Sequence, residues 1–274
     1  MHHKILDWSD AYANAPNIPG SERWPGLWVE PAQAFRDAMT AAGRVQLGLF
    51  YGDKPRNRFD LFLPEGQPKG LVVFVHGGFW IRLDRSHWSH FSRGPLAHGY
   101  AVAMPSYTQC PDARVRDITI EIGKAIEAAA ALVSGPIRLA GHSAGGHLVT
   151  RMVSSTSPLS KDTLNRIALV LSFSGLHDLR PLLRTDLNEI IGLDEQEAIE
   201  ESPALLSPVE GTRLTCWVGA SERSEFLRQN ALLANIWKGL GAETHVVEEP
   251  DRHHYNVLDG LADPHHPLTE TLLS

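Results

Sequence analysis

Apolar and polar residues follow two different rhythms along this chain. The segments "RVQLGLFYG" (44–52) and "RFDLFLP" (58–64) alternate as half-buried strands do, and they predict a β-hairpin. From Leu71 onwards the alternation stops, and the continuous apolar run "LVVFV" predicts a strand buried on both faces. Similar short runs, which predict further strands, are "YAVAMP", "PIRLAG", "IALVLSFSG", "LTCWVG" and "THVVE".

Stretches with helical character separate these strands. They cover residues 31–42, 86–98, 113–133, 144–155 and 224–240. Strands that alternate with helices predict an α/β fold, with a mostly parallel central sheet and helices on both faces. The whole chain, 1–274, is interpreted as one domain.

Two segments depart from this alternation. Residues 176–210 contain short helical pieces, and we interpret them as a small cap-like insertion above the sheet. Residues 1–30 are rich in Pro, Gly, Trp and Asn, and they predict an irregular arm held down by Trp8, Trp24 and Trp28. Together with the first helix, this arm forms an N-terminal region over 1–44.

A candidate nucleophile follows the strand "PIRLA". The segment "LAGHSAGGH" (139–147) contains Gly141-His142-Ser143-Ala144-Gly145, which fits the G-x-S-x-G pattern of a nucleophile elbow. The chain must turn sharply from strand to helix there, so glycines remove side chains that would clash. The alternative, a plain Gly-Ser turn that caps a helix, is less consistent with the strand–turn–helix context. Ser143 is therefore the predicted nucleophile.

A serine hydroxyl needs a neighbouring base, and in proteins with such an elbow an acid and then a histidine follow the serine along the chain. After the last strand, "PDRHHYNVL" supplies His254 as the predicted base, with His253 as the alternative. Glu222, shortly after the strand "LTCWV", is the predicted acid. Glu225 is its competitor, although an exposed glutamate in the first turn of a helix is the more ordinary interpretation of that residue.

Backbone N–H groups should stabilise the oxyanion that forms during acyl transfer. One is predicted at Ala144, directly after the nucleophile. The others are predicted in the loop His76-Gly77-Gly78-Phe79, where glycine lets the main chain approach a substrate. Gly78 is the first choice, with Gly77 or Phe79 as helper.

Composition and charge exclude several other classes of function. The formal net charge of −7 disfavours nucleic acid as a partner, and no apolar run approaches the ~20 residues that cross a bilayer. The N-terminal residues lack the apolar core of a signal peptide, and Cys110 and Cys216 form no motif, so we expect reduced thiols and a cytoplasmic location.

The 14 histidines form no ligand cluster with carboxylates or cysteines, so we expect no metal and no cofactor. A small-molecule substrate is the expected partner, and a homodimer stays open.

Three motifs give the chain a specific resemblance. "HGGFW" (76–80), "GHSAGGHL" (141–148) and "SGLHDLRPLL" (174–183) resemble α/β-hydrolases of the esterase and lipase type, and more narrowly the kynurenine formamidase branch. The match covers residues 45 to 260. It implies hydrolysis of an N-formyl arylamine to formate and the free amine, with transient formylation of Ser143. The family more often uses Asp where this chain offers Glu222, and often Tyr where it has Phe79.

An aryl substrate would account for an aromatic mouth on the pocket. Phe79, Trp80 and Tyr107 are the predicted substrate contacts, with Trp88 as a further candidate, because aromatic rings stack on one another. Packing of the cap onto the sheet is an equally good interpretation of Trp88 and Tyr107. Two other hypotheses stay open: a general carboxylesterase acting on short acyl esters, and a binding protein without activity. Four further residues are interpreted as structural, namely the ion pair Asp178–Arg180 and the packing residues His142 and His147.

Overall fold

The computed structural model describes residues 4–274, and its centre is one sheet with the strand order β1-β2-β4-β3-β5-β6-β7-β8. β2 pairs antiparallel with β1 and with β4, and every other neighbouring pair is parallel. The predicted hairpin and the mostly parallel α/β sheet are therefore confirmed. The strands are β1 (Val45–Phe50), β2 (Arg58–Phe62), β3 (Leu71–Val75), β4 (Ala101–Pro105), β5 (Ile137–His142), β6 (Ile167–Phe173), β7 (Arg213–Gly219) and β8 (Glu243–Glu249).

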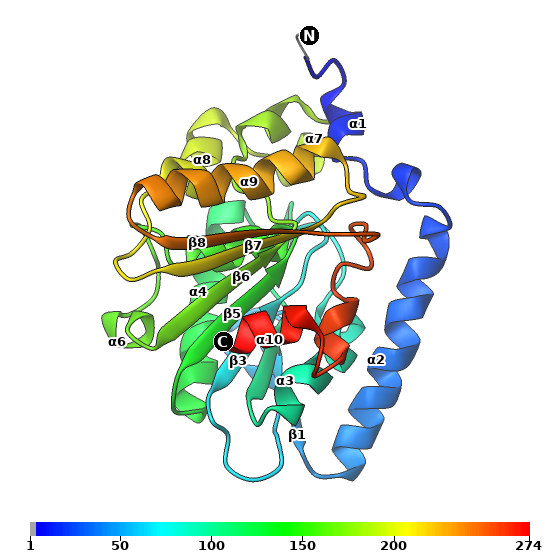
Figure 1. The fold of residues 1–274 in the computed structure, drawn as a ribbon, viewed down its shortest axis with the longest axis vertical. Helices are drawn as coiled ribbons and strands as arrows, with labels where there is room; N and C mark the ends of the chain where they lie inside the picture. The colour runs from blue at the N-terminus through cyan, green and yellow to red at the C-terminus, as the bar shows by residue number, and fades with distance from the viewer. Residues whose placement is uncertain (1–3) are drawn as a thin grey trace.

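Helices cover both faces of this sheet because its central strands carry apolar side chains on both faces (Figure 1). In β3, Val73 belongs to the core under α4 (Val115–Leu132), α5 (Ala144–Arg151) and α9 (Ser224–Gly239). Val72 and Phe74 belong to the core on the opposite face. That core is covered by α2 (Trp24–Ala41), α3 (Arg93–Ala97) and α10 (Pro267–Leu273).

Two predicted helices have different bounds from those expected. α2 begins at Trp24 rather than at residue 31, so the prediction of an irregular chain up to residue 30 is wrong for its last part. Pro25 lies in the first turn of α2, where a missing N–H costs no hydrogen bond. The stretch 86–98 is broken into two short 3₁₀ turns followed by α3, because Asp84 accepts hydrogen bonds from Ser86 and starts a separate turn.

The N-terminal arm crosses from one face of the sheet to the other (Figure 1). Its first helix, α1 (Trp8–Tyr12), lies against α9, and the Tyr12 hydroxyl donates a hydrogen bond of 2.8 Å to Glu225. α2 then packs on the other face against residues 85–92. The arm therefore passes over the edge at which the parallel strands end.

Residues 176–210 lie on the same face as α9 and α5. They form two short 3₁₀ turns together with α7 (Asn188–Ile191) and α8 (Glu195–Glu200), and α6 (Lys161–Leu164) precedes them. The Trp237 indole of α9 donates to the carbonyl oxygens of Pro203 and Leu206, which fixes this segment beside the helix.

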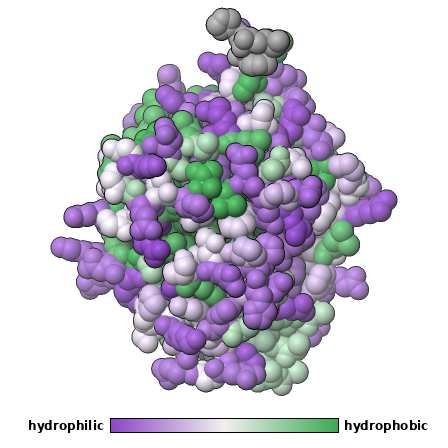
Figure 2. Space-filling view, viewed as in Figure 1, coloured by the Kyte–Doolittle hydropathy of each residue, from purple (hydrophilic) through white to green (hydrophobic). Residues whose placement is uncertain are grey.

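The surface of the face that carries α10 is mixed in polarity. Figure 2 shows charged and polar side chains spread over it, interrupted by small apolar patches. Within residues 4–274, no helix combines the length and the hydropathy that crossing a bilayer requires.

Candidate active site

Ser143 occupies a strained turn between β5 and α5. Its φ is +56°, a conformation that residues with a side chain rarely adopt. A Cβ on Gly141 would lie 2.1 Å from the Gly145 carbonyl oxygen, and one on Gly145 would lie 2.0 Å from that of Val75. Only glycine therefore fits at either position. The Ser143 hydroxyl is buried and has no hydrogen-bond partner among the described residues.

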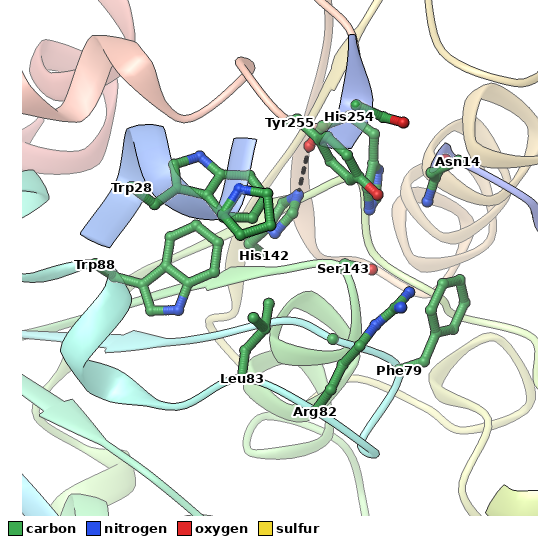
Figure 3. A pocket seen from close by; sticks show the side chains of 13 residues that line it. Asn14, Trp28, Phe79, Arg82, Leu83, Trp88, His142, Ser143, His254 and Tyr255 are labelled. Atoms are coloured by element: carbon green, nitrogen blue, oxygen red, sulfur yellow. Dashed lines mark hydrogen bonds between the residues drawn. The ribbon is translucent and has the colours of Figure 1, made fainter. Parts of the chain in front are cut away.

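A carboxylate–imidazole pair lies beside this turn. His254 Nδ1 is 2.6 Å from Glu222 Oε2, and both side chains are almost fully buried. Since an ionised carboxylate can only accept, Nδ1 carries the proton and Nε2 is left free to accept one. Ser143 and His254 line one pocket (Figure 3), so the structure brings the predicted serine, histidine and glutamate together.

Glu222 has two further partners that hold its carboxylate in place. Oε1 accepts hydrogen bonds from the Gly219 amide at 3.0 Å and from the Ser174 hydroxyl at 2.5 Å. Ser174 has a φ of +49° at the end of β6, and its own amide donates to Trp217 of the neighbouring strand. Ser174 begins the motif "SGLHDLRPLL", but no local pattern predicts its contact with Glu222.

The two competing residues have other surroundings. The ring of His253 packs edge-on against Trp24, with the ring centroids 5.2 Å apart, and burial lowers the pKa of this histidine. Glu225 was expected to be exposed, and that is wrong. It is buried, because it accepts hydrogen bonds from Tyr12 and from Arg228. Glu225 thus anchors the N-terminal arm on α9.

His142 has a role that the interpretation as a packing residue missed. Its Nε2 lies 2.9 Å from the carbonyl oxygen of His254, as the dashed line in Figure 3 marks. Burial, reinforced by His254, holds the pKa of His142 well below its usual value, so the ring is neutral. Because a carbonyl oxygen only accepts, Nε2 carries the proton and donates it. His142 therefore fixes the backbone that carries His254.

The glycines of the loop after β3 permit a close approach to the nucleophile. A Cβ on Gly77 would lie 3.0 Å from Ser143 Cβ, and one on Gly78, whose φ is +107°, would lie 2.3 Å from the Arg82 carbonyl oxygen. Ala144 is the first residue of α5, so its N–H has no acceptor within the helix. The predicted oxyanion residues thus surround Ser143 from two sides.

The pocket above Ser143 has a volume of about 110 Å³. Phe79 lines it, as predicted, and so does Trp88 (Figure 3). The full lining comprises Asn14, Ser21, Pro25, Trp28, Gly78, Phe79, Arg82, Leu83, Trp88, His142, Ser143, His254 and Tyr255.

Trp80 and Tyr107 do not reach the pocket, so their prediction as substrate contacts is corrected. Trp80 is fully buried, with its ring edge-on to His147. Tyr107 stacks on the His76 ring at 4.5 Å and donates to the His76 carbonyl oxygen at 3.1 Å. The reason is local backbone geometry: Phe79 and Trp80 both have positive φ, so the turn sends Trp80 into the core. Tyr107 therefore supports the glycine loop through His76.

The cover of the pocket comes from the N-terminal region. Among the described residues, the lining includes Asn14, Ser21, Pro25 and Trp28, and it includes none from 176–210. Trp28 packs on Trp88 with ring centroids 4.8 Å apart. The expected cap over 176–210 therefore lies beside the site rather than over it. The ion pair expected within that segment is present, with Arg180 Nη2 2.9 Å from Asp178 Oδ2.

Cys110, Cys216 and His147 lie outside the lining of the pocket. No group of three potential metal ligands occurs within residues 4–274. Cys110 and Cys216 are free and buried, and burial raises the pKa of each thiol to about 12. His147 points away from the nucleophile and bonds the Glu201 carbonyl oxygen at 2.7 Å.

Comparison with known proteins gives matches to a family model, to individual sequences and to solved structures. Residues 59–208 match the model of the BD-FAE family. The kynurenine formamidases of Danio rerio and Salmo salar are each 27% identical to this chain, over 81% and 83% of it and over 79% and 80% of their own lengths. An isoprenylcysteine alpha-carbonyl methylesterase of Arabidopsis thaliana is 26% identical over 81% of this chain and 58% of its own length.

Two solved structures are also similar to this chain. A proposed thioesterase from Silicibacter sp. TM1040 is 45% identical and superposes with a TM-score of 0.92, covering 99% of this chain and 100% of its own. Esterase B from Lactobacillus rhamnosis, inhibited by a phosphonate, superposes with a TM-score of 0.66 at 18% identity, covering 92% of this chain and 91% of its own. The second likeness is one of fold alone.

Proposed function

The chain belongs to the BD-FAE family of α/β-hydrolases, and we propose that it is a serine hydrolase that cleaves N-formyl arylamides, such as N-formylkynurenine, to formate and the aryl amine. The observation that carries the proposal is the 2.6 Å contact between His254 Nδ1 and Glu222, next to a buried serine hydroxyl on a glycine-flanked turn. The similarity to kynurenine formamidases over about four fifths of the chain supports the choice of substrate.

In the first half of the reaction, Ser143 Oγ attacks the formyl carbon while His254 Nε2 takes the hydroxyl proton. Glu222 accepts the Nδ1–H hydrogen bond and stabilises the imidazolium that forms. The N–H groups of Ala144 and of the Gly78 loop donate to the carbonyl oxygen as it becomes negative. The C–N bond then breaks, and His254 gives its proton to the departing amine.

In the second half, water attacks the formyl ester on Ser143. His254 removes a proton from the water and returns it to Ser143 Oγ as the ester bond breaks, so formate leaves and the free serine is restored. The first half needs a hydrogen bond from the Ser143 hydroxyl to His254 Nε2, and such a bond is often established only when the substrate is bound.

The size of the pocket supports a small acyl group. Its volume of about 110 Å³ is well below the ~300–1,000 Å³ of ordinary ligand pockets. A formyl or acetyl group fits beside Ser143, with the aryl amine reaching towards Phe79 and Trp88.

Hydrolysis of short-chain esters or thioesters is the second candidate. It is favoured by the 45% identical chain described as a proposed thioesterase and by the methylesterase relatives. These acyl compounds need the same nucleophile, base and oxyanion donors, so the site chemistry alone does not separate them.

The deciding experiment measures kcat/KM for N-formylkynurenine, p-nitrophenyl acetate and S-phenyl thioacetate. Each value is divided by the rate constant for uncatalysed hydrolysis, because the activated ester reacts readily by itself. We expect the largest ratio for N-formylkynurenine. A larger ratio for either acetyl compound would replace the formamidase proposal with the second candidate.

A further inference from the structure

Arg82 is an unpaired cation in the wall of the pocket. Its side chain is exposed, and it forms no ion pair or hydrogen bond within residues 4–274. Figure 3 shows its guanidinium directed into the space between Ser143 and Phe79. Histidines aside, Arg82 is the one charged residue in the lining that the structure describes, and no carboxylate lies there to balance it.

The backbone ties Arg82 to the loop that is expected to hold the oxyanion. The amide of Arg82 donates to the Gly78 carbonyl oxygen at 3.2 Å, and the amide of Ile81 donates to the same oxygen at 3.0 Å. The Arg82 carbonyl oxygen in turn lies so close to Gly78 Cα that no Cβ would fit there. The Arg82 backbone is therefore held beside the predicted oxyanion loop.

Within the described residues Arg82 has no carboxylate partner, unlike several other arginines of this chain, whose formal net charge is −7. Arg85 pairs with Asp60 at 2.8 Å, and Arg180 pairs with Asp178. A positive pocket wall in an acidic protein attracts anionic ligands and repels cationic ones.

We propose that Arg82 binds a carboxylate on the aryl side of the substrate, so that the enzyme prefers anionic aryl substrates over neutral ones. This inference rests on the proposed function, which places the formyl group at Ser143 and the aryl amine towards Phe79. A formyl group has no position for a carboxylate, so the anion must belong to the amine that leaves. The planar guanidinium can bind both oxygens of a carboxylate with two parallel hydrogen bonds.

The test uses two matched pairs of substrates. One pair is 3-formamidobenzoate and 3-formamidobenzamide, and the other is 3-acetoxybenzoate and 3-acetoxybenzamide. Within each pair the shape is nearly constant while the negative charge is lost, together with one acceptor oxygen that becomes an N–H donor group. The readout is the ratio of kcat/KM for carboxylate to carboxamide, in the wild type and in the variants Arg82→Gln, Arg82→Lys and Arg116→Gln.

We expect the wild type to favour the carboxylate, and Arg82→Gln to lower the ratio about tenfold, as for a charge-assisted hydrogen bond at an exposed site. Arg82→Lys should retain part of the preference, because it keeps the charge and loses the second hydrogen bond. Arg116, an exposed residue of α4 outside the pocket, provides the control. Its variant removes the same charge and should leave the ratio within about twofold, because salt screens distant exposed charges.

The inference is overturned if the wild type shows no preference, or if Arg82→Gln and Arg116→Gln lower the ratio equally. The two pairs separate this outcome from a failure of the proposed function. Cleavage of the acetoxy pair alone, with the carboxylate preference intact, rejects the formamidase and supports the role of Arg82. Cleavage of the formamides without a preference supports the formamidase and rejects that role.

Discussion

The active site combines two regions of different origin: a catalytic edge and a cover. The catalytic edge consists of the residues that directly follow β3, β5, β7 and β8, with Ser143, Glu222 and His254 among them. The cover consists of residues 14–28, which reach the pocket from the N-terminal arm. The first region is encoded by short motifs next to strands, whereas the second depends on contacts between distant parts of the chain.

The reason for the difference is geometric. Parallel strands end at one edge of the sheet, so each residue directly after a strand is brought to the same place. The arm has no such constraint. It is held by individual contacts such as the Tyr12–Glu225 hydrogen bond and the tilted packing of the Trp28 ring against Trp88. Changes at the catalytic edge should therefore act on kcat, and changes in the cover should act mainly on KM.

The largest expected effect is at the nucleophile. Ser143→Ala should lower kcat by at least about 10⁴-fold, because the oxyanion donors and the pocket alone leave only a small residual rate. Thermal unfolding should change little, since alanine tolerates the +56° φ about as well as serine does. A serine-directed phosphonate should label the wild type and not the variant.

Ser21→Ala is the matched control from the cover. Ser21 also lines the pocket, but its hydroxyl takes no part in the proposed chemistry. The kcat of the Ser21→Ala variant should stay within about threefold of the wild-type value, because the substitution removes no buried contact and no catalytic group. Comparable losses in the two variants would contradict the division into a catalytic edge and a cover.

The second effect separates two glutamates that lie three residues apart. Glu222→Gln should lower kcat by about 10³- to 10⁴-fold, because a glutamine amide can donate to His254 and favour the wrong tautomer. Glu225→Gln should leave kcat within about threefold, and it should reduce the free energy of unfolding by about 1 kcal/mol through its contacts with Tyr12 and Arg228. Steady-state kinetics and urea denaturation of both variants test this. The opposite pattern would move the acid to Glu225.

The sequence was sufficient to predict the parts of the molecule that local patterns encode. Apolar runs identified the strands of the sheet, and the glycine pattern around Ser143 identified the turn, since both depend on neighbouring residues. The orientation of Trp80 was not predictable, because it follows from positive φ values at Phe79 and Trp80, and neither residue type indicates such a conformation. Ser174 was missed for another reason: it lies 48 residues from Glu222, and only the pairing of β6 with β7 brings them together. The cover likewise depends on how distant segments meet.

The third prediction concerns Ser174. Ser174→Ala should lower kcat about tenfold with KM nearly unchanged, because Glu222 Oε1 loses one of its two hydrogen bonds and holds His254 less firmly. The split between kcat and KM distinguishes a positioning role from a loss of folding. Ser172→Ala is the control, since Ser172 is a buried serine of β6 whose hydroxyl faces His177 instead. Equal effects of the two substitutions on kcat would assign Ser174 a structural role only.

The smallest effect is expected where the cover is attached. Arg223 binds the Asp10 carboxylate and also donates to the Asn17 side chain at 3.2 Å, so this contact holds the arm near the pocket. Asp10→Asn removes the charge with little change in shape. An ion pair this exposed contributes about 0–1 kcal/mol, so KM for an aryl substrate should rise no more than about fivefold while kcat stays unchanged.

The control is Asp37→Asn, on the exposed side of α2, which should change neither constant. A fall in kcat with Asp10→Asn would show that the arm helps to organise the catalytic residues, and the separation between catalytic edge and cover would then have to be abandoned.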